Sequence, residues 1–291
     1  MLCAFVVEKQ FLETYTQTFE SLTDLTISYF PFDNEEAETA EQWQISIYTD
    51  KPEQVMTLIE KIRKKFNLPS VEISTIDIEN KDWVTEVQKN FKPILVNNIY
   101  IYSSFYQNTL SQHQNAICIN IDPGNAFGTG EHHTTKGCLR AISQLSKTND
   151  FINIIDVGSG SAILAIAAAK LFRNAKILAT DIDMDAVKVA QENIEKNNAE
   201  NILAIQADGI DHQTITTNTP FELIICNILS SVLIQIASDI NNISSPSTIL
   251  VLSGLTIRQL EDVTDCYNQH QFKTLEVIYE DEWCTIIMKK L

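Results

Sequence analysis

The side chains best suited to chemistry gather in residues 122–135, which read DPGNAFGTGEHHTT. The chain has only 8 glycines in 291 residues, and three of them fall here, directly before His132 and His133. Glycines let a backbone approach a ligand closely, histidines bind metals, and glycine-rich loops bind phosphate. The stretch therefore raises three alternatives, which are a metal site, a phosphate loop and the loop of a cofactor site.

The surroundings of His132 and His133 argue against a metal. Adjacent histidines on one loop rarely converge on a single ion, and the chain has no CxxC or HxxxH spacing. The 6 cysteines lie far apart, which fits reduced, mostly buried thiols in the cytosol. We expect no bound metal, and histidines that contact substrate or pack within the loop.

A second glycine pair favours a cofactor site. In IIDVGSGSAILAIAAAKL a predicted strand ends at Asp156-Val157, Gly158 and Gly160 form a turn, and an alanine-rich helix begins. The helix start offers free N–H groups to an anion. Asp181 lies 23 residues after Gly158, at the end of the next predicted strand. A carboxylate there can accept hydrogen bonds from both ribose hydroxyls of a nucleoside cofactor.

The same turn distinguishes between two cofactors. A dinucleotide site requires a third glycine at position 163, but this residue is Ile163, whose side chain would block contact between the helix and a pyrophosphate. S-adenosylmethionine has no pyrophosphate and needs less room. The residues therefore favour S-adenosylmethionine over NAD. The two glycines could also serve only to shape a strand–helix turn, but the position of Asp181 relative to Gly158 argues against this purely structural role.

The string CNILSSVL brings Asn227 to the end of a further predicted strand. Ligands of open α/β sheets bind outside the carboxyl ends of the strands. The side-chain oxygen of Asn227 and the backbone carbonyl of Ile228 can accept hydrogen bonds from an incoming amine. Asparagine is also a favoured helix N-cap, so a capping role for Asn227 stays open beside the catalytic one.

Two folding units are predicted to position these residues. Residues 1–80 have the order β-α-β-β-α-β of a ferredoxin-like α+β domain, and residues 81–115 form a linker with a helix over 82–91 and a hairpin at Asn97-Asn98. From 116 to 291 strands and helices alternate, with a helix from about Leu229 to Asn241 and an antiparallel hairpin at the end. This alternation predicts an α/β, doubly wound parallel sheet.

The charge narrows the partners. A formal net charge of −17 argues against recognition of nucleic-acid phosphates and suits a basic protein partner, although acidity that only keeps the protein soluble stays an alternative. The sequence has no run of about 18 apolar residues, the length needed to span a bilayer. The N-terminus lacks the basic region of a secretory signal. We expect a cytoplasmic protein without membrane contact.

Together these features resemble the PrmA family, the S-adenosylmethionine-dependent methyltransferases of large-subunit ribosomal protein eleven. The resemblance covers nearly the whole chain, and its most specific motif is DPGxAFGTGxHxTT, followed by DVGSGSAILAIAAAKL, CNIL, LSGL and DEWCTIIMKK. It implies a class I (Rossmann-like) methyltransferase domain behind a ferredoxin-like domain that recognises the ribosomal protein. The implied reaction is methylation of lysine side-chain and α-amino nitrogens.

The resemblance also implies the cofactor contacts, which would be Thr135, Gly158, Asp181 and Asn227, with the loop residues Phe127, Gly128 and Gly130 nearby. From the residues themselves we add Gly160 of the same turn to these contacts, and we hypothesise that Asn227 and Ile228 orient the amine. The chain departs from the family pattern at Ala162, where a third glycine is usual, at His133, where proline is usual, and after CNIL, where a proline is absent. The first departure would place a methyl group near the cofactor tail.

Two other functions remain as alternatives. A nucleic-acid methyltransferase on the same fold would stack a flipped base on an aromatic ring, but Asn227 is followed by Ile-Leu-Ser instead of Pro-Pro-aromatic. A binding module that has lost catalysis is the other alternative, and Ala162 is its main support.

Overall fold

The computed structural model describes residues 2–20, 26–32, 40–49, 51–76, 92–113, 115–122 and 132–291. The chain divides into two compact units, Met1–Asp82 and Trp83–Leu291. The helix predicted over 82–91 lies outside the described residues, as do the predicted domain boundary at residue 80 and the loop residues Phe127, Gly128 and Gly130.

The N-terminal unit has the predicted ferredoxin-like topology. Its elements are β1 (Leu2–Glu8), α1 (Lys9–Glu20), β2 (Thr26–Pro31), β3 (Gln42–Tyr48), α2 (Pro52–Phe66) and β4 (Ser74–Ile76). The sheet has the order β2-β3-β1-β4 with antiparallel neighbours. Phe5 of β1 packs edge-on against Tyr15 and Phe19 of α1, at 5.2 and 6.4 Å between ring centroids, which joins the first helix to the sheet.

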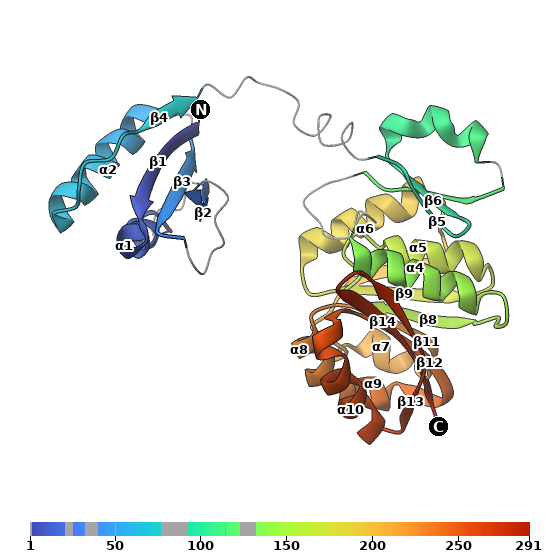
Figure 1. Cartoon of the computed structure of the whole chain (residues 1–291). Helices are drawn as coiled ribbons and strands as arrows, with labels where there is room; N and C mark the ends of the chain where they lie inside the picture. The colour runs from blue at the N-terminus through green and yellow to red at the C-terminus, as the bar shows by residue number, and fades with distance from the viewer. Residues whose placement is uncertain are drawn as a thin grey trace. The chain divides into compact units, whose positions relative to one another are not determined.

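The second unit is built on a seven-stranded sheet (Figure 1). Its strands are β8 (Asn153–Val157), β9 (Lys176–Asp181), β10 (Ile202–Gln206), β11 (Phe221–Asn227), β12 (Ser244–Thr256), β13 (Phe272–Glu280) and β14 (Trp283–Lys290). The order is β10-β9-β8-β11-β12-β14-β13, parallel from β10 to β12, with β14 antiparallel between β12 and β13. The predicted parallel sheet with its terminal hairpin is confirmed. The strand order reverses between β8 and β11, where such sheets bind ligands.

Helices cover both faces of this sheet, as the apolar strands require. On one face lie α4 (His133–Leu145), α5 (Ile163–Leu171) and α6 (Met184–Lys196). On the other lie α7 (Gln213–Thr217), α8 (Ser230–Gln235), α9 (Ala237–Asn242) and α10 (Leu260–Gln269), which follows the short η3 (Ile257–Gln259). Each face has its own buried apolar cluster.

The single helix predicted over 229–241 is wrong. The structure has two short helices there, because the backbone leaves helical geometry at Ile236, with φ −91° and ψ 3°. The stretch contains Val232, Ile234 and Ile236, and β-branched residues are poor helix formers. Periodicity alone does not reveal such a break, since the apolar positions continue across it.

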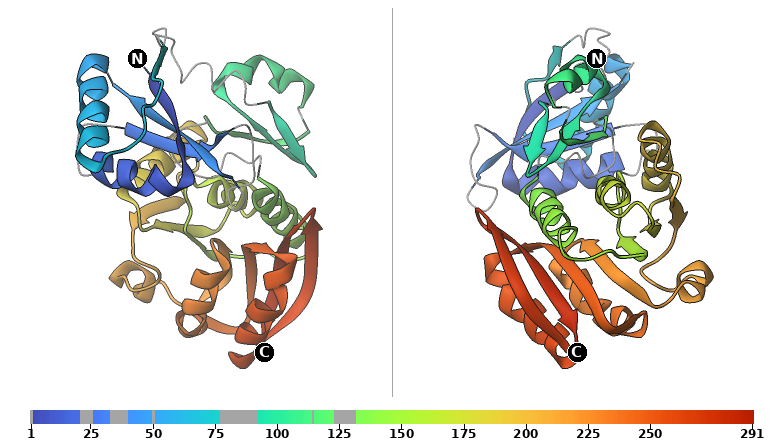
Figure 2. Two further views of the ribbon diagram at one scale, coloured as in Figure 1. Left: turned by 60° about the vertical axis from the view of Figure 1, so that its left-hand side comes forward. Right: turned by 90° about the vertical axis from the view of Figure 1, so that its right-hand side faces the viewer.

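A small sheet completes the second unit (Figure 2). It consists of β5 (Ile94–Val96), β6 (Ile99–Tyr102) and β7 (Ile117–Asn120), with the 3-10 segment η2 (Ser104–Gln112) between β6 and β7. The predicted hairpin is confirmed, since β5 and β6 pair antiparallel around Asn97, whose φ is 52°. Ile101 and Ile119 of this sheet belong to the same buried cluster as α4 and α5. In the part of the chain that the structure describes, we find no helix with the length and apolarity needed to cross a membrane.

Candidate active site

A cavity of about 700 Å³ lies at the carboxyl ends of the parallel strands. Its polar and glycine lining comes mostly from the residues that end or follow β8, β9, β10 and β11, and from the start of α4. The apolar lining comprises Val157, Ile182, Ala207, Ile228, Leu229, Val232, Ile236 and Trp283. The size and the mostly apolar lining are typical of small-molecule and cofactor sites.

The predicted glycine turn forms one wall. Gly158 and Gly160 have φ of 70° and 52°, a conformation that glycine adopts without steric cost. The N–H groups of Gly158 and Ser159 donate to the carbonyl of Thr180, at 2.8 and 2.9 Å. The turn after β8 is therefore fixed to the end of β9, the neighbouring strand.

Asp181 lies at the end of β9 and lines the cavity. Its Oδ2 accepts from the N–H of Gly160 at 2.8 Å, and its Oδ1 accepts from the N–H of Asp183 at 3.0 Å. A carboxylate has about four acceptor positions in all, so both oxygens keep capacity for ligand hydroxyls. The sequence predicted the residue but not that the glycine turn would fix its orientation.

Ala162 departs from the family pattern without entering the cavity. It has a positive φ of 61° and is the N-cap residue of α5. Its side chain is fully buried in the apolar cluster under α4 and α5, and it is not among the described residues that line the cavity. The extra methyl group therefore packs into the core and not against the space for a cofactor tail.

Asn227 offers an acceptor without a partner. Its Nδ2 lies 3.5 Å from Thr135 Oγ1, while its Oδ1 is buried and has no hydrogen-bond partner among the described residues. The N-cap residue of α8 is Leu229, with no side-chain cap, so the capping role left open for Asn227 is wrong. A buried polar atom without a partner is costly, and the side chain lines the cavity where a ligand can supply a donor.

The backbone of Ile228 lies directly beside Gly254. Gly254 has φ of 87°, and a Cβ there would collide with the carbonyl oxygen of Ile228 and lie 2.6 Å from its carbonyl carbon. A Cβ at Gly158 would collide with Cγ2 of the same isoleucine. Ile228 can therefore occupy this position only because Gly158 and Gly254 have no side chain. Gly254 lies in the quoted string LSGL, but no residue pattern assigned it a role.

The start of α4 forms another part of the cavity wall. His132 caps the helix, since its Nδ1 accepts from the N–H of Thr134 at 3.3 Å and lies 2.8 Å from the Thr134 hydroxyl. Burial, followed by the charges of His133 and Lys136, lowers the pKa of His132. His132 and Thr134 line the cavity. Thr135 is fully buried behind Asn227, and its direct contact with the cofactor stays a prediction.

The histidine pair does not converge. Nε2 of His133 lies 3.4 Å from Asp281 Oδ2 at the surface, whereas His132 faces Trp283, with 4.8 Å between ring centroids. Within the described ranges no cluster of three potential metal ligands occurs. Trp283 also lines the cavity. Sequence reasoning missed it, although the quoted string DEWCTIIMKK contains it.

Asp156, on the strand before the glycine turn, binds the helix that follows it. It is 1% exposed, and its Oδ2 accepts from the N–H of Ala165 in the first turn of α5 at 3.0 Å. Burial raises the pKa of this carboxyl to about 7, and the negative charge of Asp181 adds to the shift. Asp156 thus fixes the start of the helix that follows the glycine turn.

The strand order, the glycine turn and the acid at the end of β9 define a class I methyltransferase domain of the kind that uses S-adenosylmethionine. The chain belongs to the family Ribosomal protein L11 methyltransferase (PrmA), whose profile matches residues 11–291. The predicted family and enzyme class are confirmed.

Relatives of that name support the assignment. A ribosomal protein L11 methyltransferase of Caldicellulosiruptor saccharolyticus is 37% identical over 229 residues, 77% of this chain and 71% of the relative. One from Rhizobium rhizogenes is 33% identical over 281 residues, 96% of this chain and 93% of the relative. The crystal structure of ribosomal protein L11 methylase from Lactobacillus delbrueckii subsp. bulgaricus has a TM-score of 0.61 and 25% identity, and the match covers 69% of this chain and 100% of that chain.

Proposed function

We propose that this protein transfers methyl groups from S-adenosylmethionine to lysine side-chain and α-amino nitrogens of ribosomal protein L11. The observation that carries the proposal is the buried Oδ1 of Asn227, an acceptor without a partner at the cavity wall. The names of the relatives support the substrate. The formal net charge of −17 suits a basic protein substrate, because opposite charges steer association.

The residues present fit this cofactor. Asp181 has acceptor capacity for two ribose hydroxyls, and the turn from Gly158 to Gly160 presents backbone without side-chain obstruction to the amino-acid tail. Apolar residues such as Ile182 and Ala207 line the remaining wall and suit the flat face of a base. When bound, S-adenosylmethionine supplies an electrophilic methyl group on a positively charged sulfur.

The chain's own residues prepare the amine. An ammonium has no lone pair to attack with, so the amine must be neutral, and free lysine titrates at about 10.4. Apolar walls lower the pKa of a lysine that enters the cavity, because burial disfavours its charged form, and the amine releases its proton to water before it attacks. Asn227 Oδ1 and the Ile228 carbonyl accept from two N–H groups of the amine, and this directs its lone pair at the methyl group. Alignment then supplies much of the rate without a strong general base.

The two units divide this work in the proposal. The ferredoxin-like unit, residues 1–80 in the predicted division, recognises the ribosomal protein, residues 81–115 link it, and residues 116–291 hold the cofactor and catalyse transfer. No nucleic acid is recognised directly. A cytoplasmic location stays a prediction that accompanies the ribosomal substrate.

Labelled S-adenosylmethionine tests the substrate. The protein is incubated with it and a ribosomal extract, and the labelled band is identified by mass spectrometry. We expect label on amino nitrogens of L11. Label in RNA with none in protein would refute the substrate and favour a nucleic-acid methyltransferase. Absence of any S-adenosylmethionine binding at millimolar concentration would favour a binding module instead.

Asn227→Ala tests the amine site. Loss of one positioned polar group in an active site costs about 100-fold in kcat, and we expect that loss with L11 as substrate, while binding of S-adenosylhomocysteine weakens much less. A variant with full turnover and unchanged cofactor affinity would contradict the role of Asn227.

A further inference from the structure

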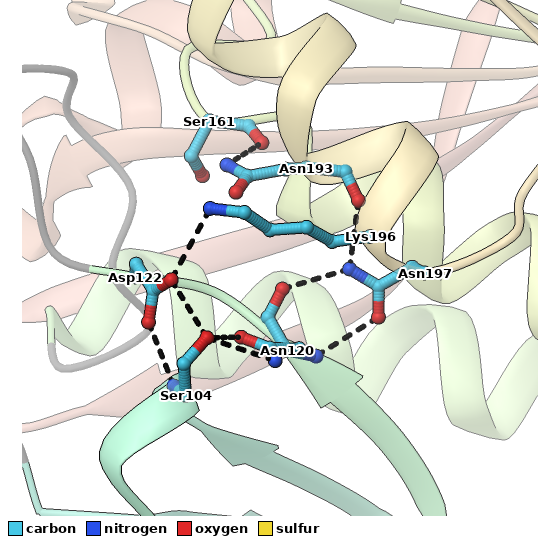
Figure 3. A network of polar contacts seen from close by, with 7 residues as sticks. All are labelled: Ser104, Asn120, Asp122, Ser161, Asn193, Lys196 and Asn197. Carbon is cyan, nitrogen blue, oxygen red and sulfur yellow. Dashed lines mark hydrogen bonds and ion pairs between the residues drawn. The ribbon is translucent and has the colours of Figure 1, made fainter.

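A chain of polar contacts joins the small sheet to the glycine turn through α6 (Figure 3). It comprises Ser104, Asn120, Asp122, Ser161, Asn193, Lys196 and Asn197. None of these residues is among the described residues that line the cavity, and the predicted site includes none of them.

Asn193 connects α6 to the turn. It is 2% exposed, and its Nδ2 donates to the backbone carbonyl of Ser161 at 2.9 Å. Ser161 is 3% exposed and stands between Gly160, which lines the cavity, and Ala162. The bond therefore acts on the peptide that directly follows the cavity wall.

This bond holds the turn from a helix, in addition to the contacts that the end of β9 makes with it. The N–H groups of Gly158 and Ser159 are fixed by Thr180, and that of Gly160 is fixed by Asp181. Beyond Gly160 the N–H of Ala162 closes a local turn on the carbonyl of Ser159 at 2.8 Å. Asn193 adds a contact from outside the two strands, at the point where the turn enters α5.

Asn197 holds Asn193 and α6 in place. Its Nδ2 donates to the carbonyl of Asn193 at 2.8 Å and to the carbonyl of Asn120 at 2.7 Å, while its Oδ1 accepts from the N–H of Asn120 at 2.9 Å. The side-chain amide thus pairs with the end of β7 as another strand would. Beside it, Lys196 Nζ lies 3.2 Å from Asp122 Oδ2.

Asp122 completes the connection to η2. Its carboxylate accepts from the N–H and the hydroxyl of Ser104, at 2.7 and 2.8 Å. Asp122 is 14% exposed at its side chain, so this contact is partly shielded from water and from salt. The end of α6 is therefore fixed to both the strand and the 3-10 segment of the small sheet.

We propose that Asn193 and Asn197 are positioning residues, which hold the turn from Gly158 to Ala162 in its cofactor-binding conformation. The inference rests on the proposed function, since it takes the ligand of that turn to be S-adenosylmethionine. Without Asn193 the turn loses its hydrogen bond to α6, and conformations of the turn that lack this bond become more populated relative to the present one. Affinity then falls in proportion to the fraction of molecules with the competent turn.

A control variant at Asn201 distinguishes a positioning role of Asn193 from a general contribution to stability. Asn201 Nδ2 donates to the backbone carbonyl of Ala175 at 2.9 Å, which is the same kind of bond at the amino ends of β9 and β10. Asn201→Ala and Asn193→Ala each remove one side-chain amide bond to a backbone carbonyl. Both lower the melting temperature, but only Asn193→Ala acts on the cavity wall.

Titration calorimetry with S-adenosylhomocysteine, on the full chain, provides the test. We expect Asn193→Ala to raise the Kd about 10-fold and Asn201→Ala to change it by less than about two-fold. Asn193→Ser keeps a short donor and is expected to raise the Kd about three-fold, and it carries the test if Asn193→Ala yields no folded protein.

The possible outcomes distinguish failure of the positioning role from failure of the proposed function. Equal Kd values for the wild type and both Asn193 variants would overturn the positioning role and leave the proposed function intact. Equal losses in the Asn193 and Asn201 variants would also overturn it, because they would show a general effect of stability. A wild-type protein that binds no S-adenosylhomocysteine would overturn the proposed function and the inference together.

Discussion

Gly254→Ala, compared with Gly209→Ala, is expected to separate backbone strain from steric collision at the cavity. Both glycines line the cavity and have positive φ, of 87° and 57°. Among the described residues, a Cβ at Gly209 would meet just Ile236 Cγ2 at 3.9 Å, an ordinary contact. A Cβ at Gly254 would meet backbone atoms of Ile228, which cannot rotate away.

The magnitudes follow from these contacts. Alanine at positive φ costs about 1–2 kcal/mol, and this cost applies at both positions. At Gly254 the Cβ would lie 2.6 Å from a carbonyl carbon, whereas carbons pack at about 3.5 Å, so the two backbones must separate by about 1 Å. Overpacking of this kind adds about 1–3 kcal/mol. We expect destabilisation of about 1–2 kcal/mol for Gly209→Ala and about 2–5 kcal/mol for Gly254→Ala.

Two measurements check the comparison. In calorimetry each kcal/mol corresponds to about 2–4 °C for a domain of this size, so the melting temperatures of the two variants should differ by several degrees. In methyl transfer, displacement of the Ile228 carbonyl by about 1 Å is expected to lower kcat about 100-fold, with a much smaller effect for Gly209→Ala. Equal melting temperatures and equal kcat values in the two variants would refute the steric reasoning.

Three further predictions concern residues in or next to the site. Burial raises the pKa of Asp156 to about 7, so the contribution of its protonated form to stability is complete below the pKa of unfolded aspartate, about 3.9, and is lost as the pH rises through about 7. The gain in unfolding free energy from Asp156→Asn should therefore be larger at pH 8 than at pH 5, by about 1–4 kcal/mol in calorimetry. A gain that is independent of pH would contradict this. Ala162→Gly relieves about 1–2 kcal/mol of left-handed backbone strain, but it also loses a buried methyl group and makes the unfolded chain more flexible, and each of these losses destabilises the protein by about 1 kcal/mol. We therefore expect a melting temperature within about 3 °C of the wild type and an unchanged Kd for S-adenosylhomocysteine. A lower Kd would place the methyl group in the cavity. His132→Ala removes the cap of α4 and should cost about 1 kcal/mol, whereas His132→Asn keeps a favoured cap and should cost less; equal unfolding free energies would exclude the cap as the source of stability.

The sequence predicted the architecture well because its signals are local. Strands β8 to β11 are short apolar runs bounded by glycine, asparagine and proline, and their parallel arrangement follows from the βα alternation. The order of the strands in the sheet was not predicted. The helix α4 was not predicted, since its cap is His132 and none of the common capping residues occupies that position. The break at Ile236 was missed because no glycine or proline marks it.

The site was predictable where chemistry requires a particular residue type. Gly158, Gly160, Asp181, Asn227 and Ile228 all line the cavity. Trp283 and Gly254 escaped residue reasoning because their roles depend on a pairing across β12 and β14 and on a contact with Ile228. Asn193 escaped it as well, since an asparagine within a helix reads as a surface residue until the carbonyl it faces is known.

The place of β14 in the sheet makes the binding site depend on the pairing of the last strands. β14 lies between β12 and β13 although it follows both in the chain, and its first residue, Trp283, lines the cavity. β14 therefore both connects β13 to the rest of the sheet through its hydrogen bonds and carries the aromatic wall of the cavity. Local opening of β14 removes that wall, so a ligand that contacts Trp283 favours the closed sheet. Amide exchange in β12, β13 and β14 then reports on occupancy of the cavity, including at residues that no ligand touches.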